Sequence, residues 1–358
     1  MIKVVSCEGN EQTMKKQSRG LFDEQIRLDK LTVQNDPLVK LVRHIDFEFF
    51  RKPLESHFQA GKDRSQGGRP AFDYLMMFKI LILQRYYNLS DDNTEYAILD
   101  RLSFMRFLGL TITDRVPDAK TIWNYRNELM KAGLVEKLFK LLDSTLDKKG
   151  VILQAGKMVD ASIVEVPIQR NSEEENNQIK TGVIPQDWKE NTAKMSQKDV
   201  DARWYIQKGK SYYGYKNHIK ADVGTKLITS YEVTPANVLE GDVLPFLIDK
   251  TDKGQKLYGD KAYYQKDIEE LLASEKIVSK IHVKGYRYQK LTKRQDADNT
   301  RKSKTRARIE HIFGFMSNSM NRMYLRCRSI NRIDTSIGLM NITYNLFRLG
   351  QLKISLAR

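Results

Sequence analysis

The chain has 358 residues, 41% of them hydrophobic and 30% charged, which is enough for two domains with apolar cores. Lysine and arginine total 61 against 45 acidic residues. The net charge of +16 favours a polyanionic partner, although a merely soluble basic protein would fit equally well. Two distant cysteines, no apolar signal segment and no membrane-length apolar run argue against a disulfide framework, structural zinc, secretion and membrane insertion. We therefore expect a cytoplasmic protein.

The first 150 residues are predicted to form a basic arm followed by a helical domain. Residues 1–35 are polar and indicate a flexible arm. From residue 36 to 150, apolar residues recur at helical spacing, for example between Phe72 and Leu83. Ser90 and Asp118 each stand where an N-terminal cap is expected, because helix-forming sequence follows them. Residues 36–150 are therefore predicted to be an all-α domain.

After residue 150 the apolar pattern changes from the helical period to that of strands. In chain order it predicts strands at residues 157–166, 212–221 and 226–233, a strand ending at Asp260, a helix around 269–272, a strand at 277–283 and a helix at 301–320. The turn at 222–225 would join the second and third strands as a hairpin. The region 151–350 is thus predicted to be an α/β domain, a mixed sheet flanked by helices.

Residues 171–210 do not fit this pattern. They hold seven acidic and seven basic side chains, few aliphatic residues and no clear period. A long stretch of this kind inside a compact domain is usually functional or mobile. We expect an insertion without regular structure between the first strand and the hairpin.

Three acidic residues stand out by their context. Asp160 lies in an apolar strand, where a carboxylate is costly unless it is paired or binds a cation, although it could also bond to neighbouring backbone. Asp260 follows a glycine at the carboxyl end of a strand, where α/β sheets place ligands, or it caps the next helix. Glu310 lies at the edge of a helix's apolar stripe, and its alternative role is an ion pair with Arg306 one turn earlier.

These three carboxylates could converge at one edge of the sheet. Such oxygen ligands suit Mg²⁺, and two ions can activate the attacking oxygen and stabilise the leaving oxygen in a displacement at phosphorus. The segment 281–328 holds 13 basic and three acidic residues, a net of +10 around Glu310. This charge suits a phosphate backbone, unless it is only a solvated basic surface. The sequence contains no phosphate-binding glycine loop, so no nucleotide cofactor is expected.

Beyond these local patterns, most of the sequence resembles bacterial insertion-sequence transposases of the DDE type, which have an RNase H-like catalytic fold. Residues 67–129 are similar to the family's helical N-terminal domain over the segments GGRPAFDYLMMFKILILQRYYNLSDDNTEYAILDRLSFMRFLGL and PDAKTIWNYRNEL. The catalytic motifs follow in the family's order, with VDASIVEVP for the first aspartate, YYGYKNHIKAD for the hairpin, LYGDKAY for the second aspartate and TRARIEHIFGFM for the glutamate.

The resemblance implies that the three carboxylates are catalytic and bind two Mg²⁺ ions, which Mn²⁺ could replace. The implied catalytic residues and metal ligands are Asp160, Asp260 and Glu310. It also implies that Arg306 lies near the phosphates of the transposon end. Many relatives carry a tyrosine where this chain has Ser303 and a lysine where it has Ser317. Contacts to DNA would then involve further basic residues, namely Lys304, Arg308, Arg322 and Lys261.

The resemblance also implies a course of reaction. The protein would bind the terminal inverted repeats of its own element as double-stranded DNA, cleave a strand to leave a 3′-hydroxyl, and join that hydroxyl to target DNA. A homodimer or a larger assembly on DNA is expected. End recognition would fall to the helical domain, unless that domain is only a scaffold or a dimer interface. Two alternatives stay open, an RNase H-like metal nuclease without strand transfer and a decayed relative that binds DNA without catalysis.

Overall fold

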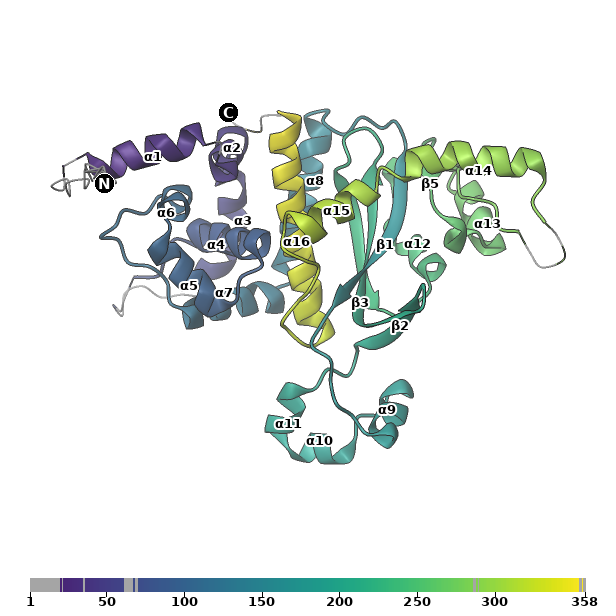
Figure 1. Cartoon of the computed structure of the whole chain (residues 1–358), viewed down its shortest axis with the longest axis horizontal. Helices are drawn as coiled ribbons and strands as arrows, with labels where there is room; N and C mark the ends of the chain where they lie inside the picture. Colours follow the sequence, from purple (N-terminus) through teal and green to yellow (C-terminus); the bar gives the residue numbers. More distant parts are fainter. Residues whose placement is uncertain are drawn as a thin grey trace, which may run out of the picture.

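The computed structural model describes residues 20, 22–34, 36–60, 67, 70–285, 288, 290–353 and 356. Figure 1 shows a helical N-terminal half and a C-terminal half built on a sheet, with the long helix α16 (Ile330–Leu352) between them. Among the helices of these ranges, none is both long and apolar enough to cross a membrane.

The N-terminal half is helical, as predicted. Its elements are α1 (Asp23–Val33), α2 (Pro37–His44), the 3-10 helix η1 (Phe47–Phe50), α3 (Arg51–Gln59), α4 (Tyr74–Tyr87), α5 (Asp91–Asp100), α6 (Leu102–Leu108), α7 (Ala119–Lys131) and α8 (Leu134–Lys148). Both predicted caps are confirmed. The backbone N–H of Asn93 donates to Ser90 Oγ (3.2 Å), and that of Thr121 donates to Asp118 Oδ1 (2.6 Å).

The predicted flexible arm contains a helix, α1, that is attached to the rest of the domain. Arg106 in α6 donates hydrogen bonds to the Leu28 carbonyl (3.0 Å) and to the Thr32 hydroxyl (2.8 Å). The same guanidinium pairs with Asp36 at 2.9 Å. The composition of residues 1–35 could not predict this attachment, because Arg106 lies more than 70 positions later in the sequence. Residues 1–19, 21 and 35 of the arm lie outside the described residues.

One mixed sheet forms the framework of the C-terminal half. In the described part of the chain its strands are β1 (Lys157–Glu165), β2 (Arg203–Gln207), β3 (Lys210–Asp222), β4 (Ile228–Pro235), β5 (Lys256–Tyr258) and β6 (Val278–Ser279). The strand order is β2-β3-β1-β5-β6, with β4 also paired to β3. β1 runs antiparallel to β3 and parallel to β5, so the prediction of a mixed sheet is confirmed.

The predicted hairpin joins β3 and β4. Asp222 Oδ2 closes its turn by accepting hydrogen bonds from the backbone N–H (2.8 Å) and the hydroxyl (2.9 Å) of Thr225. Gly214 allows β3 to approach β1 closely. A Cβ at this position would lie 2.2 Å from the Val164 carbonyl oxygen, and its φ of +152° disfavours other residues.

Helices cover both faces of the sheet. The larger hydrophobic cluster combines the helical domain, α15 (Glu310–Asn318), α16 and the sheet face that carries Met158. On the opposite face, Val159 belongs to a second cluster with α12 (Glu240–Leu247) and α13 (Lys266–Ser274). Because α16 contacts α2, α4, α7 and α8 as well as β4, the two halves of the chain share one core.

The prediction that residues 171–210 lack regular structure is wrong. The segment contains α9 (Glu173–Lys180), α10 (Gln186–Glu190), α11 (Thr192–Gln197) and β2, and Figure 1 shows its three helices projecting below the sheet. Trp188 is fully buried there, and its indole N–H donates to Glu175 Oε1 at 2.7 Å. Helices of five to eight residues contain too few turns to show a hydrophobic period.

The predicted helix at 301–320 is interrupted, and two helices, α14 (Lys293–Arg306) and α15, take its place. Between them the N–H of Arg308 bonds to the Thr305 carbonyl (3.2 Å) and the N–H of Ile309 to the Arg306 carbonyl (2.9 Å). These bonds have the tighter spacing of a 3-10 turn. No glycine or proline marks the break, which places Arg306 at the end of one helix and Glu310 at the start of the next.

The predicted strand at 277–283 is also shorter, because only β6 has strand geometry. The chain after it stays beside β5, where the N–H of Lys280 donates to the Leu257 carbonyl (2.8 Å) and that of His282 to the Gly259 carbonyl (3.2 Å). The remaining elements are the 3-10 helices η2 (Lys250–Asp252) and η3 (Lys261–Tyr263).

Candidate active site

Asp160 lies in β1, the strand between β3 and β5. Because side chains alternate along a strand, Asp160 shares the sheet face of Met158, which belongs to the same hydrophobic cluster as α15. The side chain is only 18% exposed. The backbone N–H of Ala161 donates to its Oδ1 at 2.9 Å. The bond to neighbouring backbone that was the alternative role of Asp160 is therefore present.

Asp260 follows β5 after Gly259. β5 runs parallel to β1 with Met158 opposite Tyr258, so Asp160, within β1, and Asp260, after the end of β5, each lie two residues beyond this pair. The side chain of Asp260 caps η3, since the backbone N–H of Ala262 donates to its Oδ1 at 2.6 Å. The capping role is therefore present, and it uses one of the two carboxylate oxygens.

The guanidinium of Arg306 connects Asp160 with Glu310. Its Nη1 donates to Asp160 Oδ2 at 2.9 Å, and its Nη2 donates to Glu310 Oε1 at 3.1 Å. The ion pair predicted as the alternative role of Glu310 thus exists, but it is part of a bridge to Asp160. Glu310 is 62% exposed whereas Arg306 is 21% exposed, so the glutamate lies on the solvent side.

Negative groups are concentrated at this edge of the sheet. Burial raises the pKa of the Asp160 carboxyl to about 7; the charge of Arg306 opposes this, while those of Glu240 and Asp260 add to it. Burial also raises the pKa of Glu240, and the charge of Asp260 acts in the same direction. The buried hydroxyl of Tyr263 has its pKa raised well above the usual value, by burial and by the nearby Asp160. A bound cation would relieve this repulsion.

The donor chemistry of this site fits a magnesium ion. Carboxylate oxygens are the ligands that Mg²⁺ prefers, and here they come from β1, from the segment after β5 and from α15. The described residues contain no ready-made group of three His, Cys, Asp or Glu side chains that could hold a metal ion. The cation between Asp160 and Glu310 is the Arg306 guanidinium. Two buried polar atoms, Arg306 Nε and the Tyr263 hydroxyl, have no hydrogen-bond partner within the described ranges.

Two of the predicted DNA contacts are exposed close to these carboxylates. Lys304 lies on α14 two residues before Arg306, and Lys261 directly follows Asp260. Neither lysine forms a salt bridge with a described residue. Positions two apart on a helix point to different sides, so Lys304 does not share the face from which Arg306 reaches the carboxylates.

The other two predicted contacts are placed differently. Arg308 is exposed but donates to the Val223 carbonyl at 2.9 Å, so it is tied to the turn between β3 and β4. Arg322 follows Asn321, whose carbonyl accepts a hydrogen bond from the Asn88 side chain (2.7 Å). Arg322 therefore lies at the junction with the helical domain and is not grouped with Asp160.

The sequence interpretation missed Glu240 and His282. Glu240 opens α12 and pairs with the buried Lys216 at 3.5 Å, and an acidic residue in a first helical turn is too common to attract notice. His282 Nε2 lies 3.3 Å from the hydroxyl of Ser303, the position where many relatives were expected to have tyrosine. Neither contact could be recognised from the neighbouring residues in the sequence, because each connects two different elements of the fold.

The sheet carries one aspartate on its central strand and a second after the parallel neighbour, with a glutamate on a packed helix. This arrangement defines an RNase H-like catalytic domain, preceded here by a helical domain. The family model described as "Transposase DDE domain" matches residues 158–346, and "Transposase domain (DUF772)" matches residues 26–128. The first match covers more than half of the chain. The chain therefore belongs to the DDE transposases of insertion sequences.

One similar solved structure is the cryo-EM structure of a piggyBac transposase synaptic complex with hairpin DNA. The similarity covers 88% of this chain and 75% of that chain, with 14% sequence identity and a TM-score of 0.44.

Proposed function

We propose that this transposase binds the terminal inverted repeats of its own insertion sequence and catalyses metal-dependent strand cleavage and strand transfer. Asp160, Asp260 and Glu310 are the proposed catalytic residues and ligands of two Mg²⁺ ions, for which Mn²⁺ can substitute. One observation carries the assignment. Asp160 and Glu310, 150 positions apart in the sequence, meet at a single cationic group beside the strand that leads to Asp260.

The chain's own groups have distinct parts in this reaction. Mg²⁺ held by the three carboxylates would activate the attacking oxygen and stabilise the leaving oxygen of an in-line displacement at phosphorus. Asp160 is fixed by the pairing of β1 with both neighbours and by the Ala161 N–H. Glu310 is largely exposed and can change its rotamer as DNA arrives. Arg306, once it leaves the carboxylates, can donate two hydrogen bonds to a phosphate.

The proposed partner is double-stranded DNA at the transposon end and at the target. Arg306, Lys304 and Lys261 would contact phosphates near the scissile bond, whereas Arg308 and Arg322 would contact the DNA further away. The net charge of +10 over residues 281–328 supports a path along this surface. End recognition is assigned to the helical domain, and a homodimer or larger assembly would pair two ends. The cytoplasm, at the nucleoid, is the expected location of such an enzyme.

The assignment is tested by two isosteric substitutions, Asp160→Asn and Glu310→Gln. Each should abolish cleavage of an end duplex in Mg²⁺ while binding of that duplex stays near the wild-type level, because neither residue is a proposed phosphate contact. Asp296→Asn is the matched control, since Asp296 is an exposed acid on the neighbouring α14. Undiminished cleavage by either active-site variant would remove the assignment.

A second assay separates transposition from simple hydrolysis. A pre-cleaved end duplex with a free 3′-hydroxyl is incubated with a supercoiled plasmid in Mg²⁺. Joined product is expected, and it should disappear with Asp160→Asn. Cleavage of intact ends without any joining would instead identify a metal nuclease on the same fold.

A further inference from the structure

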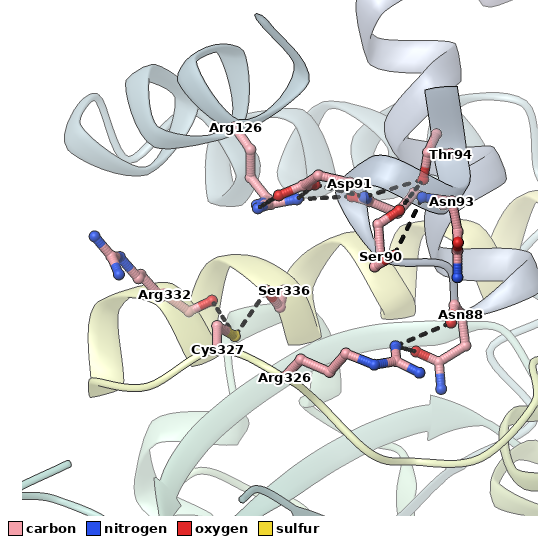
Figure 2. Close-up of polar contacts among 11 residues, drawn as sticks. Asn88, Ser90, Asp91, Asn93, Thr94, Arg126, Arg326, Cys327, Arg332 and Ser336 are labelled. Atoms are coloured by element: carbon pink, nitrogen blue, oxygen red, sulfur yellow. Dashed lines mark hydrogen bonds and ion pairs between the residues drawn. The ribbon is translucent and has the colours of Figure 1, made fainter. Parts of the chain in front are cut away.

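A second polar site lies away from the three carboxylates, between the helical domain and the start of α16. It is a cavity of about 280 Å³ lined by residues of α4, α5 and α7 and by the segment from Arg326 to Ser336. Four of its lining residues are arginines, Arg85, Arg126, Arg326 and Arg332, and we call it the arginine cavity. Figure 2 shows Arg126 and Asp91 on its helical-domain side, with Arg326, Cys327 and Arg332 on the other.

The positive charge of the arginine cavity is only partly balanced. Arg126 is neutralised, because its two terminal nitrogens bond to the two oxygens of Asp91 at 2.7 and 2.8 Å. Within the described ranges, no carboxylate pairs with Arg85, Arg326 or Arg332. The cavity's remaining acid is Asp92, so four arginines face two aspartates.

The unbalanced arginines have guanidinium groups available for a ligand. Among the described residues Arg326 donates hydrogen bonds to Asn88 alone, and Arg332 approaches the ring of Trp123 at 5.9 Å. Burial lowers the pKa of Arg85 to about 10, so it stays charged at neutral pH without a described hydrogen-bond acceptor. Desolvated positive charge of this kind is stabilised by an anion.

The chemistry of the lining matches a phosphodiester. Guanidinium groups bind phosphate oxygens through paired hydrogen bonds. Trp123 adds an aromatic ring, and the Lys120 ammonium lies 4.2 Å from the centre of that ring with Arg332 also near it. An aromatic ring beside cationic groups suits a sugar or base next to the phosphate. Trp123 belongs to α7 of the helical domain, the domain to which DNA-end recognition is assigned. Arg326 and Arg332 are exposed, so the cavity opens to solvent on their side.

We propose that the arginine cavity binds a backbone phosphate of the transposon-end DNA, held by Arg85, Arg326 and Arg332. Arg126 is a positioning residue, since Asp91 and Gln84 fix it in the wall. The proposal rests on the proposed function, because it takes DNA as the partner. It adds a DNA contact that spans the helical domain and α16, outside the surface around Arg306.

The chain carries its own reporter for this contact. Cys327 lines the cavity, and its thiol lies 3.7 Å from the Arg332 carbonyl and 3.5 Å from the Ser336 hydroxyl (Figure 2). The second cysteine of the sequence is Cys7, so Cys7→Ser leaves one thiol in the full chain. Its reaction with N-ethylmaleimide is followed by mass spectrometry with no ligand, with inorganic phosphate, and with a duplex of about 30 base pairs at low salt.

Duplex at about ten times its Kd should slow alkylation of Cys327 about tenfold, because only unbound protein would react. Inorganic phosphate at the same phosphate concentration should leave the rate nearly unchanged. An unchanged rate on protein shown by anisotropy to be duplex-bound would overturn the proposal while leaving DNA binding intact. Equal protection by phosphate alone would overturn it in favour of a small-anion site. Absence of any duplex binding would instead refute the proposed function itself.

A substitution gives an independent readout. Arg332→Ala changes an exposed side chain and should lower the salt dependence of duplex binding by about 0.9 in log Kd per log salt, the value for one lost phosphate contact. Lys140→Ala is the charge-matched control, because Lys140 is exposed on α8 and pairs with Glu136. A slope that is unchanged in Arg332→Ala, or reduced equally in both variants, would contradict the proposal.

Discussion

Two arginine-containing regions of this chain differ in how their positive charge is balanced. At the candidate active site one guanidinium, that of Arg306, bonds to two carboxylates. In the arginine cavity four guanidinium groups share two aspartates, and within the described residues only Arg126 is paired with one of them. At the first region two carboxylates share one guanidinium, whereas in the second the arginines outnumber the aspartates.

This difference separates two tasks that a DNA-processing enzyme must perform. A group of carboxylates attracts a divalent ion and repels DNA until that ion arrives. A group of arginines attracts phosphate without needing a metal. We therefore expect the first region to respond to divalent ions and the second to DNA, and four experiments test this division.

The largest expected effect is the loss of cleavage in Asp260→Asn. Removing one of the three proposed ligands should cost several kcal/mol of transition-state stabilisation, or about 10³-fold in rate. Duplex binding measured without metal should change little, because the arginine cavity is untouched. The variant Asp267→Asn, an exposed acid on α13, serves as control. Parallel loss of cleavage and duplex binding in Asp260→Asn would contradict the division.

The second experiment compares the pH dependence of the two regions. Since burial raises the pKa of Asp160 to about 7, the carboxyl holds a proton below that pH. A divalent ion must displace this proton, so Mn²⁺ affinity should fall about tenfold per pH unit below 7 and level off above 8. Metal-free duplex binding should change far less between pH 6 and 8, because the arginines remain charged. Mn²⁺ affinity that is flat across this range would disprove the role given to Asp160.

The third experiment removes the guanidinium that bridges the carboxylates. Arg306→Gln should tighten Mn²⁺ binding to the DNA-free protein about three- to tenfold, because the competing cation is gone. Lys304→Gln, on the same helix but without a carboxylate partner among described residues, should leave Mn²⁺ affinity unchanged. Paramagnetic resonance of free Mn²⁺ gives both values. Weaker Mn²⁺ binding in Arg306→Gln would show that the arginine supports the ion rather than competing with it.

The smallest effect is expected from restoring a family residue. Ser317 is exposed on α15, where many relatives were expected to carry lysine. Ser317→Lys should raise duplex affinity a few-fold and steepen its salt dependence by about 0.9, as one added phosphate contact requires. Fluorescence anisotropy over a salt series measures both quantities. An unchanged slope would mean that this position does not face DNA.

The parts of the molecule that could be predicted share a local signal. Asp160 could be recognised because an acidic residue interrupts the apolar pattern of a strand. The turn that begins at Asp222 could be recognised because it lies between two predicted strands. Glu310 depended on the family resemblance, since an exposed acid on a helix is common. Its position after a break at 307–309 could not be foreseen, because the break is made by backbone bonding without glycine or proline.

The parts that escaped prediction depend on contacts between distant segments. The arginine cavity combines α7 with residues about 200 positions later, so no stretch of sequence contains its pattern. The insertion at 171–210 was misjudged for a different reason. Among its helical residues Ile179 and Trp188 are buried, and the Trp188 indole bonds to Glu175; two buried residues spread over three short helices produce no period.

Asp160 is proposed to bind the ion that drives strand cleavage, and replacing its ligand atom tests this role. In Asp160→Cys a thiolate replaces the carboxylate; Mg²⁺ binds sulfur poorly, whereas Mn²⁺ tolerates it better. Cleavage of an end duplex is measured in each metal for this variant and for the wild type. If Asp160 is a metal ligand, we expect the variant to be inactive in Mg²⁺ and to regain cleavage in Mn²⁺. Wild-type cleavage by the variant in Mg²⁺ would contradict it.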